Sequence, residues 1–165
     1  MAKILVAMSG GVDSSYTAAK LKKDGNEVIG ATLDFKLACS PLAISDAKKI
    51  ANILNIEHHT LDLENDFNSK IISYFKESYY NGLTPNPCAK CNREIKFAIL
   101  LKYMEEIGAD FLATGHYANI ENSVLSKAID LKKDQSYFLS MLKYEYLKNI
   151  IFPLGKFTKT QVREA

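Results

Sequence analysis

The sequence predicts an α/β protein with one parallel sheet and helices on both of its faces. Short apolar runs alternate, over the first two thirds of the chain, with longer segments whose apolar residues recur at helical spacing. This alternation is typical of strand–helix–strand units, which make their strands parallel and pack their helices against the sheet. The first run, KILVAM at 3–8, is apolar at nearly every position, as expected for a strand covered on both faces.

The individual strands and helices follow from these alternating runs. The predicted strands are short, and they cover 3–8, 27–33, 57–61 and 110–114. The predicted helices carry an apolar face, and three of the four end close to glycine, a common C-terminal signal. They cover 14–23, 46–54, 65–81 and 92–108, and a loop is expected over 35–40. Beyond Tyr117 the pattern is less regular, with a hairpin expected at 121–123 and a helix at about 135–142.

Length and composition favour one domain and exclude few functions. With 165 residues, 47% of them hydrophobic, the chain can bury one substantial core, so we predict a single domain over 1–165. The net charge of +2 neither demands nor excludes a nucleic-acid partner. No apolar run approaches a membrane span and no signal peptide precedes the first strand, so we expect a cytoplasmic protein. An odd number of cysteines, 3, argues against a disulfide framework and for thiol chemistry or a metal.

The segment SGGVDSS at 9–15 is too small and polar for a core, and it lies where the first strand turns into the first helix. In an open parallel sheet this turn is the usual phosphate site. Gly10 and Gly11 let main-chain N–H groups approach an anion, and the helix N-terminus adds unpaired donors. The serines add hydroxyl donors, and Asp13 is a candidate magnesium ligand. The pattern is neither GxGxxG nor a P-loop ending in GK[ST], and the alternative is a tight serine-capped turn without a ligand.

SGGVDSS resembles the SGGxDS signature of the PP-loop ATP pyrophosphatases. This resemblance implies a Rossmann-like parallel sheet of the adenine nucleotide α-hydrolase-like kind. Enzymes of this superfamily cleave ATP between the α- and β-phosphates, usually to adenylate a substrate oxygen. The motif alone does not choose among them.

A second segment, TPNPCAKCNREIKF at 84–97, puts two thiols in a loop that prolines stiffen. Cys91 is expected just before the helix at 92–108, where the helix terminus and the neighbouring basic residues favour thiolate over thiol. A thiolate beside an ATP site suggests a sulfur nucleophile. The alternatives are structural zinc, an iron–sulfur cluster held by three cysteines including Cys39, a redox dithiol, and plain structural cysteines.

With this loop included, the sequence closely resembles the family of MnmA-type tRNA-specific 2-thiouridylases. SGGVDS is shared by the whole superfamily and FPLG is weak alone, whereas PNPxxxCN and KDQSYFL together are specific. The segments that carry the resemblance occur in the family's order. They are AMSGGVDSS at 7–15, TPNPCAKCNREIKF at 84–97, ATGHYA at 113–118, KDQSYFL at 133–139 and FPLG at 152–155.

The resemblance implies an enzyme that uses ATP and Mg²⁺ to adenylate the C2 oxygen of the wobble uridine in tRNA. Persulfide sulfur from a sulfur-relay protein then displaces AMP and leaves 2-thiouridine. Cys91 matches the family's nucleophilic cysteine. The implied ATP contacts are Ala7, Met8, Ser9, Gly10, Gly11, Val12, Asp13, Ser14, Leu33 and Gly115. The implied contacts with the target base are Asn86, Pro87 and Cys88, and those with tRNA are Lys133, Asp134 and Gln135.

Two features depart from the family pattern. Cys88 stands where the family often has an acid, which keeps the iron–sulfur alternative open. The family's second catalytic cysteine, which carries the persulfide, and its central and C-terminal domains belong to segments beyond Ala165. We therefore expect this chain alone to lack complete thiolation activity. The alternatives are a non-catalytic remnant that binds ATP or tRNA, and another PP-loop adenylating enzyme with a small-molecule substrate.

Several polar residues outside these motifs also have predicted places. His116 follows Gly115 at a strand end and either approaches the nucleotide or caps the sheet edge. His58 and His59 are expected to pack on opposite faces of their strand. Asp34 follows the second strand and either reaches the nucleotide or is a solvated loop acid, and we expect the latter.

Overall fold

The computed structural model describes residues 1–37 and 40–165, so the predicted cluster thiol Cys39 lies outside the described residues. Its main sheet has the strand order β3-β2-β1-β4-β7, and every neighbouring pair is parallel. The strands are β1 (Lys3–Ala7), β2 (Glu27–Asp34), β3 (Glu57–Asp62), β4 (Phe111–Thr114) and β7 (Ile150–Ile151). The predicted parallel α/β fold is confirmed.

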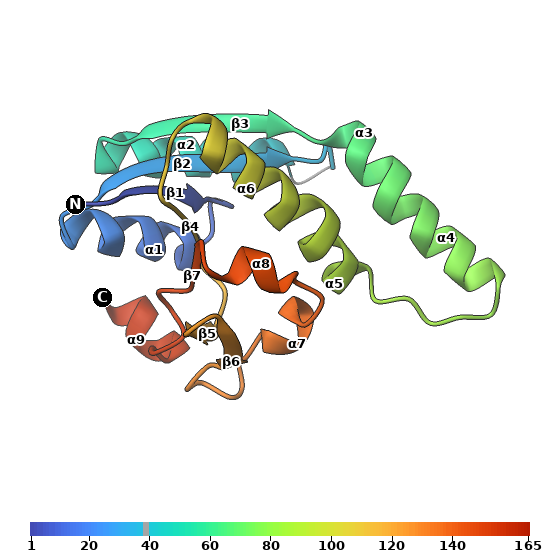
Figure 1. Cartoon of the computed structure of the whole chain (residues 1–165). Helices are drawn as coiled ribbons and strands as arrows, with labels where there is room; N and C mark the ends of the chain where they lie inside the picture. The colour runs from blue at the N-terminus through green and yellow to red at the C-terminus, as the bar shows by residue number, and fades with distance from the viewer. Residues whose placement is uncertain (38–39) are drawn as a thin grey trace.

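Helices cover both faces of this sheet, and they bury the side chains of β1 that point to either side. Ile4 and Val6 pack in one core cluster with α1 (Val12–Lys23) and α2 (Ser40–Leu54). Leu5 points the other way and packs with Phe97 and Leu100 of α6 (Phe97–Glu106). Figure 1 shows α6 in front of the sheet and α2 behind it. Alternating residues of one buried strand therefore hold the two helical layers in place.

Two element boundaries differ from the sequence prediction near the end of β2. The strand runs to Asp34, and this carboxylate is buried, with Oδ2 2.8 Å from Lys36 Nζ, so the expectation of a solvated loop acid is wrong. The following helix begins at Ser40 and not at Asp46. Pro41 is compatible with this because the first turn of a helix does not need its N–H groups.

Residues 64–96 form a helical arm that projects from the sheet (Figure 1). Its first helix is continuous through α3 (Glu64–Phe67), the π-helical segment η1 (Asn68–Ile72) and α4 (Ser73–Tyr80). Of the predicted apolar face on this helix only Ile71 is buried, and Phe75 and Tyr79 are exposed. The second helix runs through α5 (Pro87–Cys91) and the π-helical η2 (Asn92–Lys96) directly into α6.

The second helix of the arm begins five residues earlier than the sequence predicts. Asn86 is its N-cap, and the Asn86 side-chain oxygen accepts a hydrogen bond of 3.1 Å from the backbone N–H of Ala89. Pro87 fits the first position, where a missing N–H costs nothing. Cys91 therefore lies inside a helix, not before one.

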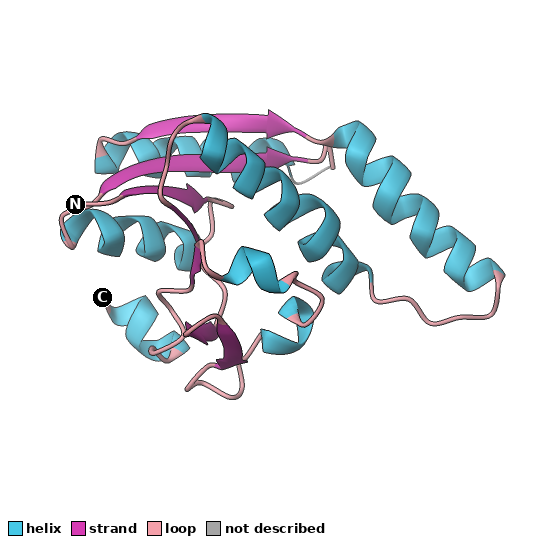
Figure 2. Ribbon diagram, viewed as in Figure 1, coloured by secondary structure: helices cyan, strands magenta, loops and turns pink. Residues whose placement is uncertain are grey.

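The last third of the chain is a set of short elements packed beside β4 and β7 (Figure 2). β5 (Ala118–Glu121) and β6 (Val124–Lys127) form the predicted hairpin, with positive φ at Asn122 and Ser123. The predicted helix at 135–142 is shorter in the structure. The helices here are α7 (Ser136–Leu139), α8 (Tyr144–Leu147) and α9 (Lys159–Glu164). In the described part of the chain, no helix has the length and apolarity to cross a membrane.

Candidate functional site

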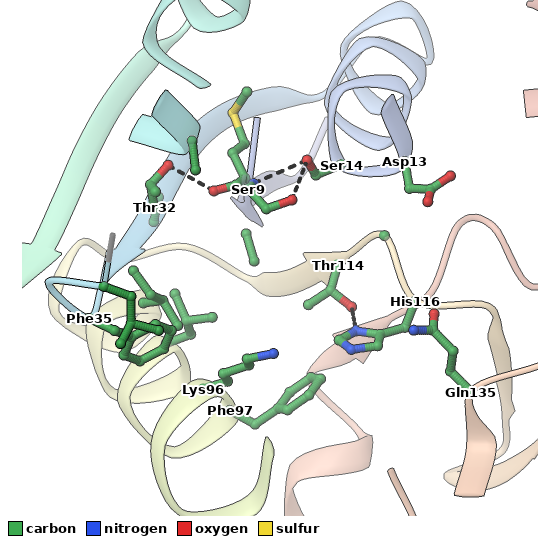
Figure 3. A pocket seen from close by; sticks show the side chains of 18 residues that line it. Ser9, Asp13, Ser14, Thr32, Phe35, Lys96, Phe97, Thr114, His116 and Gln135 are labelled. Carbon is green, nitrogen blue, oxygen red and sulfur yellow. Dashed lines mark hydrogen bonds between the residues drawn. The ribbon is translucent and has the colours of Figure 1, made fainter. Parts of the chain in front are cut away.

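A cavity of about 410 Å³ opens at the carboxyl ends of β1, β2 and β4, where parallel sheets usually bind ligands (Figure 3). Its lining includes Gln135, which the sequence assigns to tRNA. Among the predicted ATP contacts, Gly10, Gly11 and Val12 are not part of the lining, although they belong to the same turn. The predicted ATP contacts that do line it are Ala7, Met8, Ser9, Asp13, Ser14, Leu33 and Gly115.

The serines of the turn after β1 hold its backbone in shape. Ser14 Oγ accepts a 3.1 Å hydrogen bond from the backbone N–H of Ser9 and donates one of 3.0 Å to the carbonyl of Gly11. Ser15 Oγ donates to the same carbonyl, also at 3.0 Å. Figure 3 shows Ser9 and Ser14 joined at the upper edge of the cavity. Such a turn is pre-organised, and pre-organised donors are what an anion site needs.

Two glycines make the close packing around this turn possible. Gly10 has φ +74°, and a Cβ at this position would lie 2.6 Å from the carbonyl oxygen of Ala43 in α2. Gly115 follows β4, and a Cβ there would lie 3.0 Å from the backbone nitrogen of Ser14. The turn is thus clamped between α2 and the end of β4, and a side chain at either glycine would push it out of place.

His116 lies between the cavity and the aromatic core. Its Nδ1 is 2.7 Å from Thr114 Oγ1, and its ring is 5.8 Å from that of Phe97 and 6.0 Å from that of Phe152. Burial and the nearby Lys96 ammonium lower the pKa of His116 to about 4, so the ring is neutral at physiological pH. The contact with Thr114 agrees with the alternative in which His116 caps the strand end. His116 also lines the cavity, and its approach to a nucleotide stays a prediction.

Lys96 was missed by the sequence analysis as a cavity residue. Among the described residues it is the only Lys or Arg that lines the cavity, and it points inward beside Phe97 (Figure 3). The sequence signal was present but ambiguous. Lys96 adjoins the apolar positions of an amphipathic helix, and a lysine at such a position usually keeps its ammonium in solvent.

Asp13, in the first turn of α1, has two partners from distant parts of the chain. Tyr117 donates its hydroxyl to Asp13 Oδ1 at 2.9 Å, and the Lys159 ammonium lies 2.6 Å from the same oxygen. Burial, and then the hydrogen bond to Asp13, raise the pKa of Tyr117 well above its usual range, so this hydroxyl stays a donor. Neither partner was a candidate from the sequence, because 104 and 146 residues separate them from Asp13.

Cys91 is buried in the arm cluster, which comprises Leu63, Ile71, Cys91 and Ile95. It is not part of the cavity lining. Leu33 and Phe35 line the cavity and also pack against the arm cluster, so the cavity and the cluster that buries the thiol share these two side chains.

The predicted thiolate-favouring environment of Cys91 is wrong for this arrangement. Burial raises the pKa of the Cys91 thiol, and the opposing effect of Lys96 is smaller. Lys90 does not reverse this, because its ammonium is 3.1 Å from a Glu94 carboxylate oxygen. The helix terminus is also too distant, since the helix begins at Pro87.

The predicted base and tRNA contacts divide into structural and exposed residues. Asn86 caps its helix, whereas Cys88 is exposed. Asp134 accepts hydrogen bonds from the backbone N–H of Ala128 at 2.8 Å and from Ser136 Oγ at 2.7 Å. Gln135 Oε1 accepts from the backbone N–H of Tyr117 at 3.0 Å. The remaining residues named for these contacts are Pro87, which is half-buried, and Lys133, which is exposed.

The described histidines and cysteines do not form a metal centre. Over residues 1–37 and 40–165, no group of three or more His, Cys, Asp or Glu side chains is placed to hold a metal ion. His58 and His59 point to opposite faces as predicted. His58 Nε2 is 2.8 Å from Thr32 Oγ1, whereas His59 lies against the ring of Tyr103.

Residues 2–165 match the model of the tRNA methyl transferase HUP domain. The chain belongs to this family. A tRNA-specific 2-thiouridylase MnmA from Campylobacter jejuni is 50% identical over 166 residues, which cover 98% of this chain and 48% of the relative. MnmA 1 from Caldanaerobacter subterraneus is 49% identical over 179 residues, with 98% and 49% covered. These relatives confirm the resemblance read from the motifs, and the chain spans about half the length of the curated relatives it matches.

Solved structures confirm the fold. A 4-thiouridine synthetase, in a complex with RNA and bound ATP, superposes with a TM-score of 0.63 at 19% identity and covers 99% of this chain and 39% of its own. A predicted subunit of tRNA methyltransferase from Methanocaldococcus jannaschii gives a TM-score of 0.60 at 23% identity, with 99% and 73% covered. At these identities the likeness is one of fold alone.

Proposed function

We propose that this chain binds ATP in the cavity at the carboxyl ends of β1, β2 and β4. The observation that carries this proposal is the SGGVDSS turn, which is pre-organised by its serines at the cavity edge and at the N-terminus of α1. Backbone N–H groups and a positive helix end suit phosphates. Leu33, Phe35 and Phe97 give the cavity an apolar wall suited to an adenine ring. The 4-thiouridine synthetase of the same fold was solved with bound ATP, which supports this assignment.

The proposed reaction of the complete protein is 2-thiolation of the wobble uridine in tRNA. The uridine C2 oxygen attacks the α-phosphate of ATP and pyrophosphate leaves. The outer sulfur of the persulfide on the second cysteine then attacks C2 and AMP leaves. The Cys91 thiol attacks the inner sulfur of this C2–S–S–cysteine linkage, which releases 2-thiouridine and leaves a disulfide between the two cysteines for an external thiol to reduce. Adenylation is needed because an amide-like oxygen is a poor leaving group until it is phosphorylated. The 2-thiouridylase names of relatives near 50% identity support this chemistry.

The family description names methyl transfer, and the cavity favours the thiouridylase assignment over it. A sulfonium methyl donor carries no phosphates, so it would make no use of a serine- and glycine-lined turn at a helix N-terminus. A triphosphate would use each part of that turn. The chemistry we propose for this cavity is therefore phosphate binding and transfer.

In this proposal Cys91 acts as a thiol after a rearrangement of the arm. Cys91 is buried in the arm cluster, and a reactive thiol must be accessible and ionised. The remainder of the full-length protein would supply the second cysteine and further grip on tRNA. Asn86, Pro87 and Cys88 at the start of the second arm helix, and the Lys133–Gln135 segment, remain the proposed base and tRNA contacts.

The proposed cofactors and partners follow from the same chemistry. Asp13 offers a carboxylate at the phosphate end of the cavity, which suits the Mg²⁺ that accompanies ATP. An iron–sulfur cluster would need Cys39 together with Cys88 and Cys91. A persulfide-donating relay protein would supply the sulfur, and such an enzyme would work where tRNA is, in the cytoplasm.

The test uses two proteins, this chain alone and a full-length protein in which this chain is joined to the remaining segments of a relative. We expect isothermal titration calorimetry to detect ATP binding by this chain, with Gly115→Val abolishing it. We expect thiolated tRNA only from the full-length protein, and Cys91→Ser to abolish thiolation while ATP binding persists. Failure of this chain to bind ATP, in a folded state, contradicts the first proposal. Undiminished thiolation by the Cys91→Ser protein contradicts the role of the thiol.

A second candidate function is an ATP-binding unit without chemistry of its own. The burial of Cys91, 7% exposed, favours this candidate for the chain in isolation. Pyrophosphate exchange with tRNA separates the two candidates. Exchange by this chain indicates adenylation, whereas ATP binding without exchange indicates the binding unit.

A further inference from the structure

Lys159 brings a cation from the far end of the chain to the phosphate end of the cavity. It is the first residue of α9, and its ammonium lies 2.6 Å from Asp13 Oδ1. Asp13 itself lines the cavity in the first turn of α1. Lys159 is not itself part of the described cavity lining, but its ammonium contacts a residue that is.

The position of Lys159 is fixed by its surroundings. Its backbone N–H donates to Asp130 Oδ2 at 2.9 Å, and its ammonium lies 5.9 Å from the centre of the Tyr117 ring. Three residues later, Val162 is buried in a core cluster that also contains Tyr117 and Leu154. Only 17% of the Lys159 side chain is exposed, so this is not a solvated surface lysine.

Lys159 reduces the electrostatic repulsion expected between Asp13 and a phosphate bound at the turn. Asp13 puts a carboxylate where the proposed ATP would carry its most negative groups, and unpaired like charges at this distance repel. Lys159 neutralises that carboxylate in the structure. An ammonium has three N–H donors, and the contact with Asp13 uses one of them, so others remain for phosphate oxygens.

We propose that Lys159 is a polyphosphate-binding residue, whose ammonium is held at the edge of the cavity by Asp13 and contacts the β- and γ-phosphates of the nucleotide. This proposal rests on the proposed binding of ATP. It makes the Phe152–Lys159 segment, as well as the turn after β1, part of the nucleotide site. It also explains why an ion pair joins the first turn of α1 to a residue 146 positions away.

The test compares nucleotides of increasing phosphate length. We expect Lys159→Met to weaken the binding of ATP and ADP by roughly tenfold or more, the usual effect of losing a charge-assisted hydrogen bond. Binding of AMP and adenosine should change by less than about twofold. Lys156→Met is the matched control, because it removes the same charge from an exposed lysine paired with Glu121 at 3.0 Å. Lys159→Arg should recover most of the affinity for ATP.

Three outcomes overturn the proposal. One is equal weakening of adenosine and ATP, which would indicate a structural role, and another is unchanged ATP binding. The third comes from repeating Lys159→Met in an Asp13→Asn background. If the loss of ATP affinity disappears there, Lys159 acts only as the counterion of Asp13. If the wild-type chain binds no ATP at all, the proposed function fails first, and that result is distinct from these.

A measurement on the unaltered chain covers the case in which Lys159→Met does not fold. The NMR signal of the Lys159 ε-methylene group can be assigned by its loss in Lys159→Arg. A larger shift with ATP than with adenosine supports the contact. Equal shifts overturn it.

Discussion

Replacing Gly10 by alanine should destabilise the protein strongly, although it adds only one methyl group. Gly10 has φ +74°, a conformation that costs an L-residue about 1–2 kcal/mol. The new Cβ would lie 2.6 Å from the Ala43 carbonyl oxygen, so α2 and the turn must separate, which typically costs a further 1–3 kcal/mol, roughly. We therefore expect Gly10→Ala to lower the free energy of unfolding by about 2–5 kcal/mol, a large part of the stability of a typical domain.

The adjacent glycine supplies a matched control. Gly11 has φ −83°, and the nearest atom to a Cβ there is Ser9 Oγ at 3.5 Å. For Gly11→Ala a small loss of N-cap quality opposes a gain from a stiffer unfolded chain, so a net change within about 1 kcal/mol is expected. Urea unfolding followed by circular dichroism measures both variants. Equal destabilisation of the two, or a loss below about 1 kcal/mol for Gly10→Ala, would refute the argument from φ and packing.

Three further predictions concern the residues around the cavity. Folding favours the neutral form of His116, so the contribution of this side chain to the free energy of unfolding is present above pH 6.5 and is lost as the pH falls toward 4. Over that range, the difference in free energy of unfolding between wild type and His116→Gln should shrink by about 3 kcal/mol, as measured by urea titrations. Alkylation mapped by mass spectrometry should modify exposed Cys88 at least about tenfold faster than buried Cys91, and equal rates would contradict the packing of the arm cluster. Lys96→Met should weaken ATP binding roughly tenfold, whereas Lys102→Met, on the solvent side of α6, should leave it unchanged within about twofold by calorimetry.

Most of the fold could be predicted because local patterns and tertiary structure agree. The strand runs at 3–8 and 110–114 are apolar, and each lies beside another strand in the sheet. The errors occur where a local signal had two meanings. The predicted helix at 46–54 leaves Pro41 outside it, but proline is also tolerated in the first turn of a helix, and α2 includes it. Asn92 was taken as the start of the second arm helix, but the capping side chain is that of Asn86.

Some residues of the site could be predicted from contiguous sequence, whereas others come together only in the folded chain. The turn at 9–15 could be predicted because every residue it needs is contiguous. Tyr117 and Lys159 could not, since they meet Asp13 only after β4 and α9 have packed beside α1. The burial of Cys91 was also beyond a local reading. Its flanking lysines suggest a thiolate, and only the packing of Leu63 and Ile71 from another helix reverses that.

The two halves of the proposed reaction rest on parts of the molecule that differ in rigidity. The phosphate half lies at the carboxyl edge of a sheet whose central strand, β1, is buried on both faces. The sulfur half lies in the arm cluster, a small group of apolar residues under a helix pair interrupted by the π-helical segments η1 and η2. Small clusters at the margin of a core open at lower free energy than the core itself. Phe35 lines the cavity and also packs against the arm cluster, so one aromatic side chain is shared by the phosphate half and the sulfur half.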